Sequence, residues 1–287
     1  MGDEGEKPGA TLYVVATPIG NLGDITVRAL EVLRSVDAIA AEDTRVTGRL
    51  LSHYGIARRL IAVHEHNEKR AVAQVLSLLR AGQSLALTCD AGTPAISDPG
   101  ALLVAAVRAA GFAVRVVPGA NAAAAAVSIS GISAPHFLFY GFLPPRSAAR
   151  RQVLAGLARL PFTLVFYEAP HRIAQTLADL AATLGGERQL VIARELTKLF
   201  ETTHACLLGE AERWLAADSM REKGEFVLIV EGAAGGEAPD RDRARSALAA
   251  LLAQLPLRQA VDLAVRITGG SRNDLYAMAL DLKKREP

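Results

Sequence analysis

Cysteine and aromatic residues are both scarce in this chain of 287 residues. The two cysteines, Cys89 and Cys206, lie far apart and outside any spacing typical of a metal site. A disulfide framework and a cysteine-based zinc site are therefore not expected. Aromatic residues make up 5% of the sequence, whereas hydrophobic residues make up 51%. This composition predicts cores built mainly from Ala, Leu, Val and Ile, and it excludes a disordered chain.

Long hydrophobic runs and a dominant charge are absent as well. The longest run of small apolar residues is Ala122 to Val127, far shorter than the ~20 residues of a membrane-spanning helix. The first nine residues are charged and Gly-containing, with no apolar signal segment behind them. The formal net charge of +2 argues against a polybasic membrane binder. We therefore expect a reduced, cytoplasmic protein with no membrane partner.

The usual nucleotide-binding signatures are missing. The sequence contains no G-x-x-x-x-G-K-[ST] and no G-x-G-x-x-G after its first β-rich run. That run leads instead into Ala16 to Asp24, a segment with two glycines and one proline. Asp24 is placed to cap the helix that follows. The segment is either a simple connection or a ligand loop, and its place at the end of a strand favours the ligand loop.

The first half of the chain alternates β-rich runs with amphipathic stretches. This alternation predicts βαβ units and a mostly parallel sheet, which binds ligands at the carboxyl ends of its strands. The expected strands are 12–16, 38–41, 60–63, 85–88 and 114–117. The expected helices are 25–36, 45–54, 68–80 and 100–110.

The second half predicts a mixed sheet, because two of its strands have little helix between them. The expected strands are 137–141, 163–167, 190–193, 201–208 and 225–230, with helices at 148–158 and 172–184. Residues 131–135 form the best interdomain linker and 232–239 a flexible hinge by composition, before a helical region over 241–284. We therefore expect a two-domain α/β fold with a disordered N-terminus (1–10), domains over 11–131 and 136–232, and a small helical C-terminal extension over 240–287.

Two further loops follow strands of the first half. In the segment from Thr88 to Gly100, Asp90 ends a strand, Gly92 allows a ligand to approach the backbone, and Asp98 is placed to cap a helix that begins at Pro99. Helix capping explains Asp98 but leaves Asp90 to Pro94 without a structural reason. In the segment from Pro118 to Ala126, a turn leads into a helix of alanines, which allows close approach of a packed element or a flat ring.

Taken together, these stretches make the sequence resemble the tetrapyrrole-methylase superfamily of S-adenosylmethionine-dependent methyltransferases (class III), and within it the members that methylate small-subunit ribosomal RNA. The resemblance runs in order from Thr11 to Gly232. Two departures are Cys89, where the family usually has Ser, and the turn Pro118 to Asn121, where it usually has Pro-Gly-Pro-Ser. The matching stretches are LYVVATPIGNLGDITVRALEVL, AEDTR, HEHNE, DAGTPAISDPG, PGANA, FYGFLP, FYEAPHRI, ARELTKLFE and GEFVLIVEG.

The resemblance implies a methyl donor, S-adenosylmethionine, folded in the cleft between two α/β domains. It implies methyl transfer to the ribose 2′-hydroxyl of a cytidine in the decoding region of 16S rRNA, on the 30S subunit or on free RNA, with no metal and by a homodimer. Carried over residue by residue, the donor-binding positions are Asp90, Thr93, Pro94, Asn121, Ala122, Leu143 and Ala193.

A general base would help this reaction, because a ribose hydroxyl is a weak acid. We single out Glu42, Glu168 and Glu195 as catalytic candidates. The spacing of the residues does not choose one base. The wider set adds Asp43, the segment His64 to His66, His171 and Lys198.

The RNA-contact candidates are basic residues near helix starts and strand ends. A helix N-terminus with a nearby arginine is a natural phosphate site, whereas an intradomain ion pair is the competing interpretation. The tail from Asp240 onward adds nine basic against six acidic residues. The candidates are Arg146, Arg150, His171, Arg172, Arg194 and Lys198.

Two other functions stay open at this stage. One keeps the fold and changes the acceptor to a tetrapyrrole precursor or another small molecule. The other is a ribosome assembly factor without catalysis. Donor binding by the purified protein separates the factor from the two enzymes.

Overall fold

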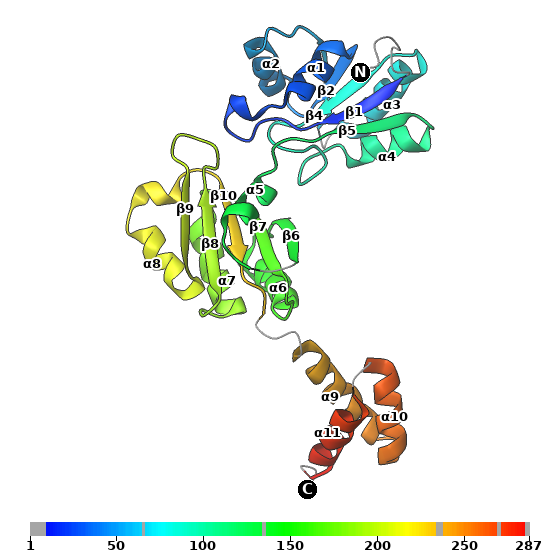
Figure 1. Cartoon of the computed structure of the whole chain (residues 1–287), viewed down its shortest axis with the longest axis vertical. Helices are drawn as coiled ribbons and strands as arrows, with labels where there is room; N and C mark the ends of the chain where they lie inside the picture. Colours follow the sequence, from blue (N-terminus) through cyan, green and yellow to red (C-terminus); the bar gives the residue numbers. More distant parts are fainter. Residues whose placement is uncertain (1–9, 65–66, 134–135, 234–237, 269–270, 285–287) are drawn as a thin grey trace, which may run out of the picture.

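The computed structural model describes residues 10–64, 67–133, 136–233, 238–268 and 271–284. Figure 1 shows two sheet-containing bodies and a helical bundle that follow one another along the long axis of the molecule. The disorder predicted for residues 1–10 falls outside the described residues, apart from Ala10. The same holds for Glu65 and His66 among the candidate bases.

The first sheet has five parallel strands in the order β3-β2-β4-β1-β5. The predicted alternation of strands and helices is present, with bounds that differ by one or two residues. The strands are β1 (Thr11–Val15), β2 (Ala38–Ala41), β3 (Arg59–Ala62), β4 (Leu85–Thr88) and β5 (Ala113–Val117). Between them lie α1 (Val27–Ser35), α2 (Thr44–His53), α3 (Glu68–Arg80) and α4 (Ala101–Ala109).

The first sheet packs helices on both of its faces, which explains its short, mostly apolar strands. Leu85 and Leu87 of β4 join a core with α3 and α4, whereas Ala86 points to the opposite core with α1 and α2. Successive side chains of a strand point to opposite faces, so one apolar run serves both cores. The loops at the carboxyl ends of the strands stay free to build a site.

Two of the predicted helix caps are wrong. The side chain of Thr26 caps α1 by accepting a hydrogen bond from the backbone N–H of Ala29, while Asp24 lies in a short 3₁₀ helix (Leu22–Asp24). Helix α4 begins after Gly100 and has no side-chain cap. Asp98 therefore does not cap α4, contrary to what the sequence predicts.

The second sheet is mixed, as predicted, in the order β6-β7-β10-β8-β9. Strands β6 and β7 are parallel, and the remaining neighbours are antiparallel. The strands are β6 (Phe137–Phe142), β7 (Thr163–Glu168), β8 (Gln189–Arg194), β9 (Thr202–Leu207) and β10 (Phe226–Val230). One face carries α6 (Ser147–Leu157), α7 (Ile173–Leu184) and α8 (Ala211–Ala216), and two 3₁₀ helices cover Leu208–Glu210 and Ser219–Glu222.

The alanine helix α5 (Ala122–Ile129) packs on the other face of the second sheet. Ala123 and Ala126 are buried against Val165, Val191 and Val227, which lie on three neighbouring strands. The sequence placed this helix in the first domain, with a boundary at residue 131. By packing it belongs with the second sheet, because its small side chains let the helix lie close to that sheet.

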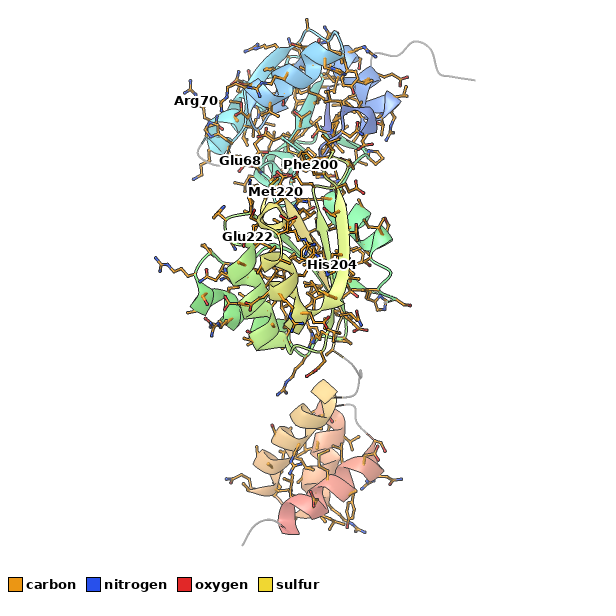
Figure 2. All side chains as sticks on the ribbon, turned by 90° about the vertical axis from the view of Figure 1, so that its left-hand side faces the viewer. Glu68, Arg70, Phe200, His204, Met220 and Glu222 are labelled. Atoms are coloured by element: carbon orange, nitrogen blue, oxygen red, sulfur yellow. The ribbon has the colours of Figure 1, made fainter. Side chains whose placement is uncertain are left out.

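The C-terminal helices α9 (Ala238–Leu252), α10 (Leu257–Thr268) and α11 (Arg272–Lys284) form a bundle of their own. Leu248, Val261 and Leu275 are buried within it, and their apolar neighbours come from the same three helices. Figures 1 and 2 show the bundle beyond the second sheet in two perpendicular views. The bundle therefore buries its apolar residues without help from either sheet.

Candidate functional site

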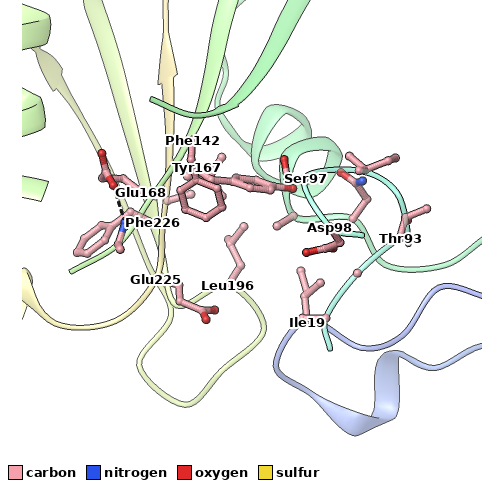
Figure 3. A pocket seen from close by; sticks show the side chains of 18 of the residues that line it. Ile19, Thr93, Ser97, Asp98, Phe142, Tyr167, Glu168, Leu196, Glu225 and Phe226 are labelled. Atoms are coloured by element: carbon pink, nitrogen blue, oxygen red, sulfur yellow. Dashed lines mark hydrogen bonds between the residues drawn. The ribbon is translucent and has the colours of Figure 1, made fainter. Parts of the chain in front are cut away.

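A cavity of about 330 Å³ lies between the two α/β domains (Figure 3). This volume is at the lower end of the range for small-molecule sites. The first domain and α5 contribute Ile19, Ala91, Gly92, Thr93, Ile96, Ser97, Asp98, Asn121 and Ala122 to its wall. The second sheet and its loops contribute Phe142, Tyr167, Glu168, Ala169, Pro170, Ala193, Leu196, Glu225, Phe226 and Val227.

Two loops of the first domain are pinned side by side at the cavity. Thr17, after β1, and Gly92, after β4, exchange backbone hydrogen bonds of 2.8 and 3.1 Å. The buried hydroxyl of Thr17 also donates to the carbonyl of Cys89 at 3.1 Å. Both loops leave the carboxyl ends of parallel strands, where ligands bind in open α/β sheets. The ligand-loop interpretation of these segments thus agrees with their position.

Both loops that face each other across the cavity hold non-glycine residues in the left-handed region. Ala95 and Ser97 have φ values of 66° and 65°, and Glu195 and Thr197 have φ values of 53° and 64°. Such conformations each cost about 1–3 kcal/mol and are concentrated at functional sites. The surrounding structure holds both loops in shapes that the chain alone would not favour.

Four of the predicted donor-binding residues line the cavity: Thr93, Asn121, Ala122 and Ala193. The hydroxyl of Thr93 donates to the carbonyl of Ala120 at 3.3 Å. The side chain of Asn121 caps α5 by accepting from the N–H of Ala124 at 3.0 Å. These two polar groups therefore also fix the local backbone.

The other three predicted donor-binding residues lie outside the cavity wall. Asp90 accepts a hydrogen bond from the backbone N–H of Asp43 at 3.1 Å, which supplies the structural reason that the sequence did not reveal. Pro94 is buried beside Thr93. Leu143 is 2% exposed and packs in the core of the second domain, so its neighbour Phe142 faces the cavity instead.

Of the three catalytic candidates, Glu168 is engaged most fully. Its side chain is wholly buried and forms an ion pair with Arg172 at 3.1 Å. It also accepts hydrogen bonds from the hydroxyl of Thr176 at 2.6 Å and the N–H of Ala169 at 2.8 Å. Glu168 thus lines the cavity with its carboxylate held by three partners, and its catalytic role stays a prediction.

The catalytic roles of Glu195 and Glu42 also stay predictions. Burial raises the pKa of Glu195, but hydrogen bonds from Lys198 and from the backbone of Glu225 outweigh it and lower the pKa. Burial raises the pKa of Glu42, whose carboxylate accepts from the N–H of Asp90. Neither residue is part of the cavity wall.

Two of the six predicted RNA contacts are buried inside the second domain. The guanidinium of Arg150 is wholly buried and forms an ion pair with Asp179 at 2.7 Å. Arg194 is 9% exposed and donates to the carbonyls of Lys223 and Met220. Both guanidinium groups are held inside the protein, which argues against the predicted RNA contact.

Arg172 forms an intradomain ion pair, but with Glu168 of its own segment and not with the segment from Arg194 to Lys198. Besides Glu168, it donates to the carbonyl of Leu143 at 2.6 Å. Lys198 lies between the carboxylates of Glu195 and Glu225 at 2.9 and 2.8 Å. Only Arg146 and His171 of the six are exposed, and both stay candidates for RNA contact.

Sequence reasoning missed several residues of the wall. Asp98 was assigned to a helix cap, and Tyr167 and Glu225 fall inside motifs that carried the resemblance without being singled out. The hydroxyl oxygen of Tyr167 accepts from the N–H of Ala123 in α5 at 3.1 Å. Leu196 and Phe142 add apolar surface.

The charged groups of the cavity wall are all acidic. Asp98, Glu168 and Glu225 face the cavity, whereas none of the described residues that line it is Lys, Arg or His. Apolar side chains make up much of the remaining wall. This wall suits a ligand with an apolar ring and a positive charge better than one with phosphates.

No group of three or more His, Cys, Asp or Glu among the described residues could hold a metal ion. No helix in the described part of the chain is long and apolar enough to cross a membrane.

Comparisons with known proteins agree with this geometry. A family model described as Tetrapyrrole (Corrin/Porphyrin) Methylases matches residues 11–212, and a model of the RsmI C-terminal HTH domain matches residues 237–283. The chain is 52% identical over 266 residues to Ribosomal RNA small subunit methyltransferase I of Xylella fastidiosa, covering 93% of this chain and 97% of the relative. It is 50% identical over 270 residues to the protein of that name from Escherichia coli O157:H7, covering 94% of each.

Solved structures share the fold at low sequence identity. The methyltransferase CobJ superposes with a TM-score of 0.60 at 19% identity, covering 78% of this chain and 95% of that one. Uroporphyrin-III C-methyl transferase from Thermus thermophilus, complexed with S-adenosylhomocysteine, superposes with a TM-score of 0.53 at 18% identity, covering 77% and 97%. The two-domain α/β architecture expected from the sequence is thereby confirmed.

Proposed function

The chain belongs to the tetrapyrrole (corrin/porphyrin) methylase family and is a methyltransferase of small-subunit ribosomal RNA, and on this basis we propose that it methylates the 2′-hydroxyl of a cytidine in the decoding region. The observation that carries the proposal is the 50–52% identity to the two rRNA methyltransferases over nearly the whole chain, C-terminal bundle included. The methyl donor is S-adenosylmethionine. Because the acceptor belongs to the ribosome, the site of action is the cytoplasm.

The interdomain cavity fits this donor. Ile19, Ile96, Leu196 and Val227 offer apolar surface to an adenine ring, and the acidic wall tolerates a sulfonium cation. When bound, the donor supplies a methyl group that is already activated for displacement. Thr93, Asn121, Ala122 and Ala193 are the donor contacts that we propose.

The protein then contributes mainly by positioning the donor and the acceptor. The pinned loops after β1 and β4 and the loop after β8 hold the reacting groups about 3–3.5 Å apart, which lowers the barrier by several kcal/mol. A bound donor that fills the cavity displaces water, so electrostatic interactions there are stronger than in solution. No metal is required for this displacement.

Binding of the ribosomal substrate is assigned to the exposed basic residues and to the bundle. Arg146 and His171 stand on the surface of the second domain, and Arg258, Arg266 and Arg272 are exposed on the bundle. The net charge of +2 is too small for the field of the whole molecule to attract RNA. Affinity therefore comes from local groups and weakens as salt is added.

We also propose a homodimer. Edge strand β6 exposes Phe137 and Tyr140 to 51% and 39%, and edge strand β5 exposes Val116 to 61%. Exposed apolar residues at two sheet edges are typical of a surface that a second copy covers. Light scattering should report a dimer for the natural chain and a monomer for the double variant Phe137→Ser, Tyr140→Ser.

The test of the function is methyl transfer with labelled donor to 30S subunits and to free 16S rRNA, followed by digestion to nucleosides. The expected product is 2′-O-methylcytidine at one site. Label in a tetrapyrrole precursor instead of RNA would favour the small-molecule alternative. Donor binding without transfer to any acceptor would favour the assembly factor.

A further inference from the structure

Asp98 is a carboxylate of the cavity wall that no described cation neutralises. It follows β4 by ten residues, in the loop that Ala95 and Ser97 hold in the left-handed region. Figure 3 shows its carboxylate directed into the space between Ile19 and Leu196. None of the ion pairs among the described residues includes Asp98.

The other two carboxylates of the wall are already engaged. Glu168 is held by Arg172 and Thr176. Glu225 forms an ion pair with Nζ of Lys198 at 2.8 Å. Both of these carboxylates therefore already have a cationic partner. Asp98 is the carboxylate of the cavity wall that has no cationic partner among the described residues.

The groups around Asp98 also favour proton uptake. The thiol of Cys89 lies beside it from the end of β4, Asp90 and Glu42 add negative charge, and Tyr167 faces it from β7. Burial, and then the charge of Asp90, raise the pKa of Asp98 against a hydrogen bond from Cys89 that lowers it. A raised pKa brings a carboxylate closer to the pH at which a general base works well.

We propose that Asp98 is the general base that receives the proton of the acceptor hydroxyl, an inference that rests on the proposed function. The ribose 2′-O–H bond breaks and its proton passes to the Asp98 carboxylate. The oxygen forms the new bond to the methyl carbon. The S–CH₃ bond breaks and its electron pair stays on sulfur, which leaves neutral S-adenosylhomocysteine. One negative and one positive charge are thereby removed together inside a cavity from which the bound donor displaces water.

The experiment compares the natural chain with Asp98→Asn and Asp98→Glu in single-turnover methyl transfer to 30S subunits over a range of pH. Asparagine keeps the size of the side chain but cannot accept the proton. We expect Asp98→Asn to lower the transfer rate by about a hundredfold or more, with a much smaller loss of donor affinity by calorimetry. Asp98→Glu should restore part of the rate. The natural chain should show a rate that rises with pH along an acid limb, and Asp98→Asn should lack this limb.

Thermal melting tests whether the Asp98→Asn variant loses activity because its fold is less stable. Because the pKa of Asp98 is raised in the folded chain, its ionised form opposes folding once the pH exceeds the unfolded value. Asp98→Asn should therefore melt at the same temperature as the natural chain, or higher, at neutral pH. The matched control is Glu31→Gln, which removes an exposed carboxylate of α1 and should change neither rate nor melting.

Three results would overturn the inference. The first is an Asp98→Asn variant as active as the natural chain, and the second is a natural rate without an acid limb. The third is a loss of donor affinity as large as the loss of rate, which would make Asp98 a donor ligand. A natural chain that binds donor but transfers no methyl group to subunits or rRNA would overturn the proposed function itself, and the inference with it.

Discussion

Gly20 and Lys198 bring the two α/β domains into direct contact beside the cavity. A Cβ atom on Gly20 would lie 2.4 Å from Cγ of Lys198 and 3.0 Å from Oγ1 of Thr197. Lys198 forms ion pairs with Glu195 and Glu225, so its side chain cannot move away without breaking one of them. The missing side chain of Gly20 therefore sets how closely the first domain approaches the loop after β8.

Gly20→Ala should weaken catalysis more than folding. The steric overlap destabilises the closed arrangement by about 1–3 kcal/mol. We expect the two domains to move apart at this contact and so relieve the overlap. We expect donor affinity or transfer rate to fall by about tenfold, as measured by calorimetry and single-turnover assay. The control is Gly156→Ala in α6, where a Cβ meets nothing within 4 Å. Normal kinetics for Gly20→Ala would mean that the domains are not held at this contact.

Arg150→Ala should destabilise the second domain strongly. It leaves the carboxylate of Asp179, 2% exposed, without its buried partner. Breaking such a pair costs about 3–5 kcal/mol, measurable by urea unfolding. Arg151→Ala is the matched control, because Arg151 pairs with the same carboxylate at 2.6 Å but is 60% exposed. It should cost about 1 kcal/mol or less, and equal losses would contradict this account of burial.

Arg146→Ala should leave stability unchanged and weaken RNA binding. Arg146 is exposed at the start of α6. If it contacts one phosphate, its removal lowers the slope of log affinity against log salt by about 0.7–0.9. Filter binding of 30S subunits over a range of salt concentrations measures this slope. An unchanged slope would remove Arg146 from the RNA surface.

A chain that ends after Ala233 should fold and bind donor but methylate subunits poorly. It keeps all ten strands and the hydrogen bond from the N–H of Ala233 to the carbonyl of Leu160. It loses a bundle whose buried residues pack against one another. Melting with and without donor, beside transfer to 30S subunits, tests both halves of the prediction. If the shortened chain failed to fold, the bundle would be needed for the stability of the α/β domains. If it kept full activity, the bundle would not be needed for RNA binding.

The sequence by itself determined the order and the approximate bounds of the strands and helices. Leu85 to Leu87 are apolar and β4 is buried at every position, so composition and length suffice to find it. The motifs also placed the site at the carboxyl ends of β1 and β4, because the parallel order of the strands follows from their alternation with helices. Thr93 reached the cavity wall for this reason, whereas Asn121 and Ala122 follow β5. Ala193 lies in β8 of the second sheet and was placed by the resemblance.

The tertiary structure alone decided what each charged residue does. Arg150 and Arg146 are four residues apart and look alike in the sequence, but Asp179 lies beside only the first of them in the folded chain. Asp98 has the pattern of a helix cap, yet α4 begins after Gly100 and the carboxylate faces the cavity. The role of a charged side chain depends on the groups within a few ångströms of it and on its exposure to water. Those partners come from segments far along the chain, which only the packing of the two sheets brings together.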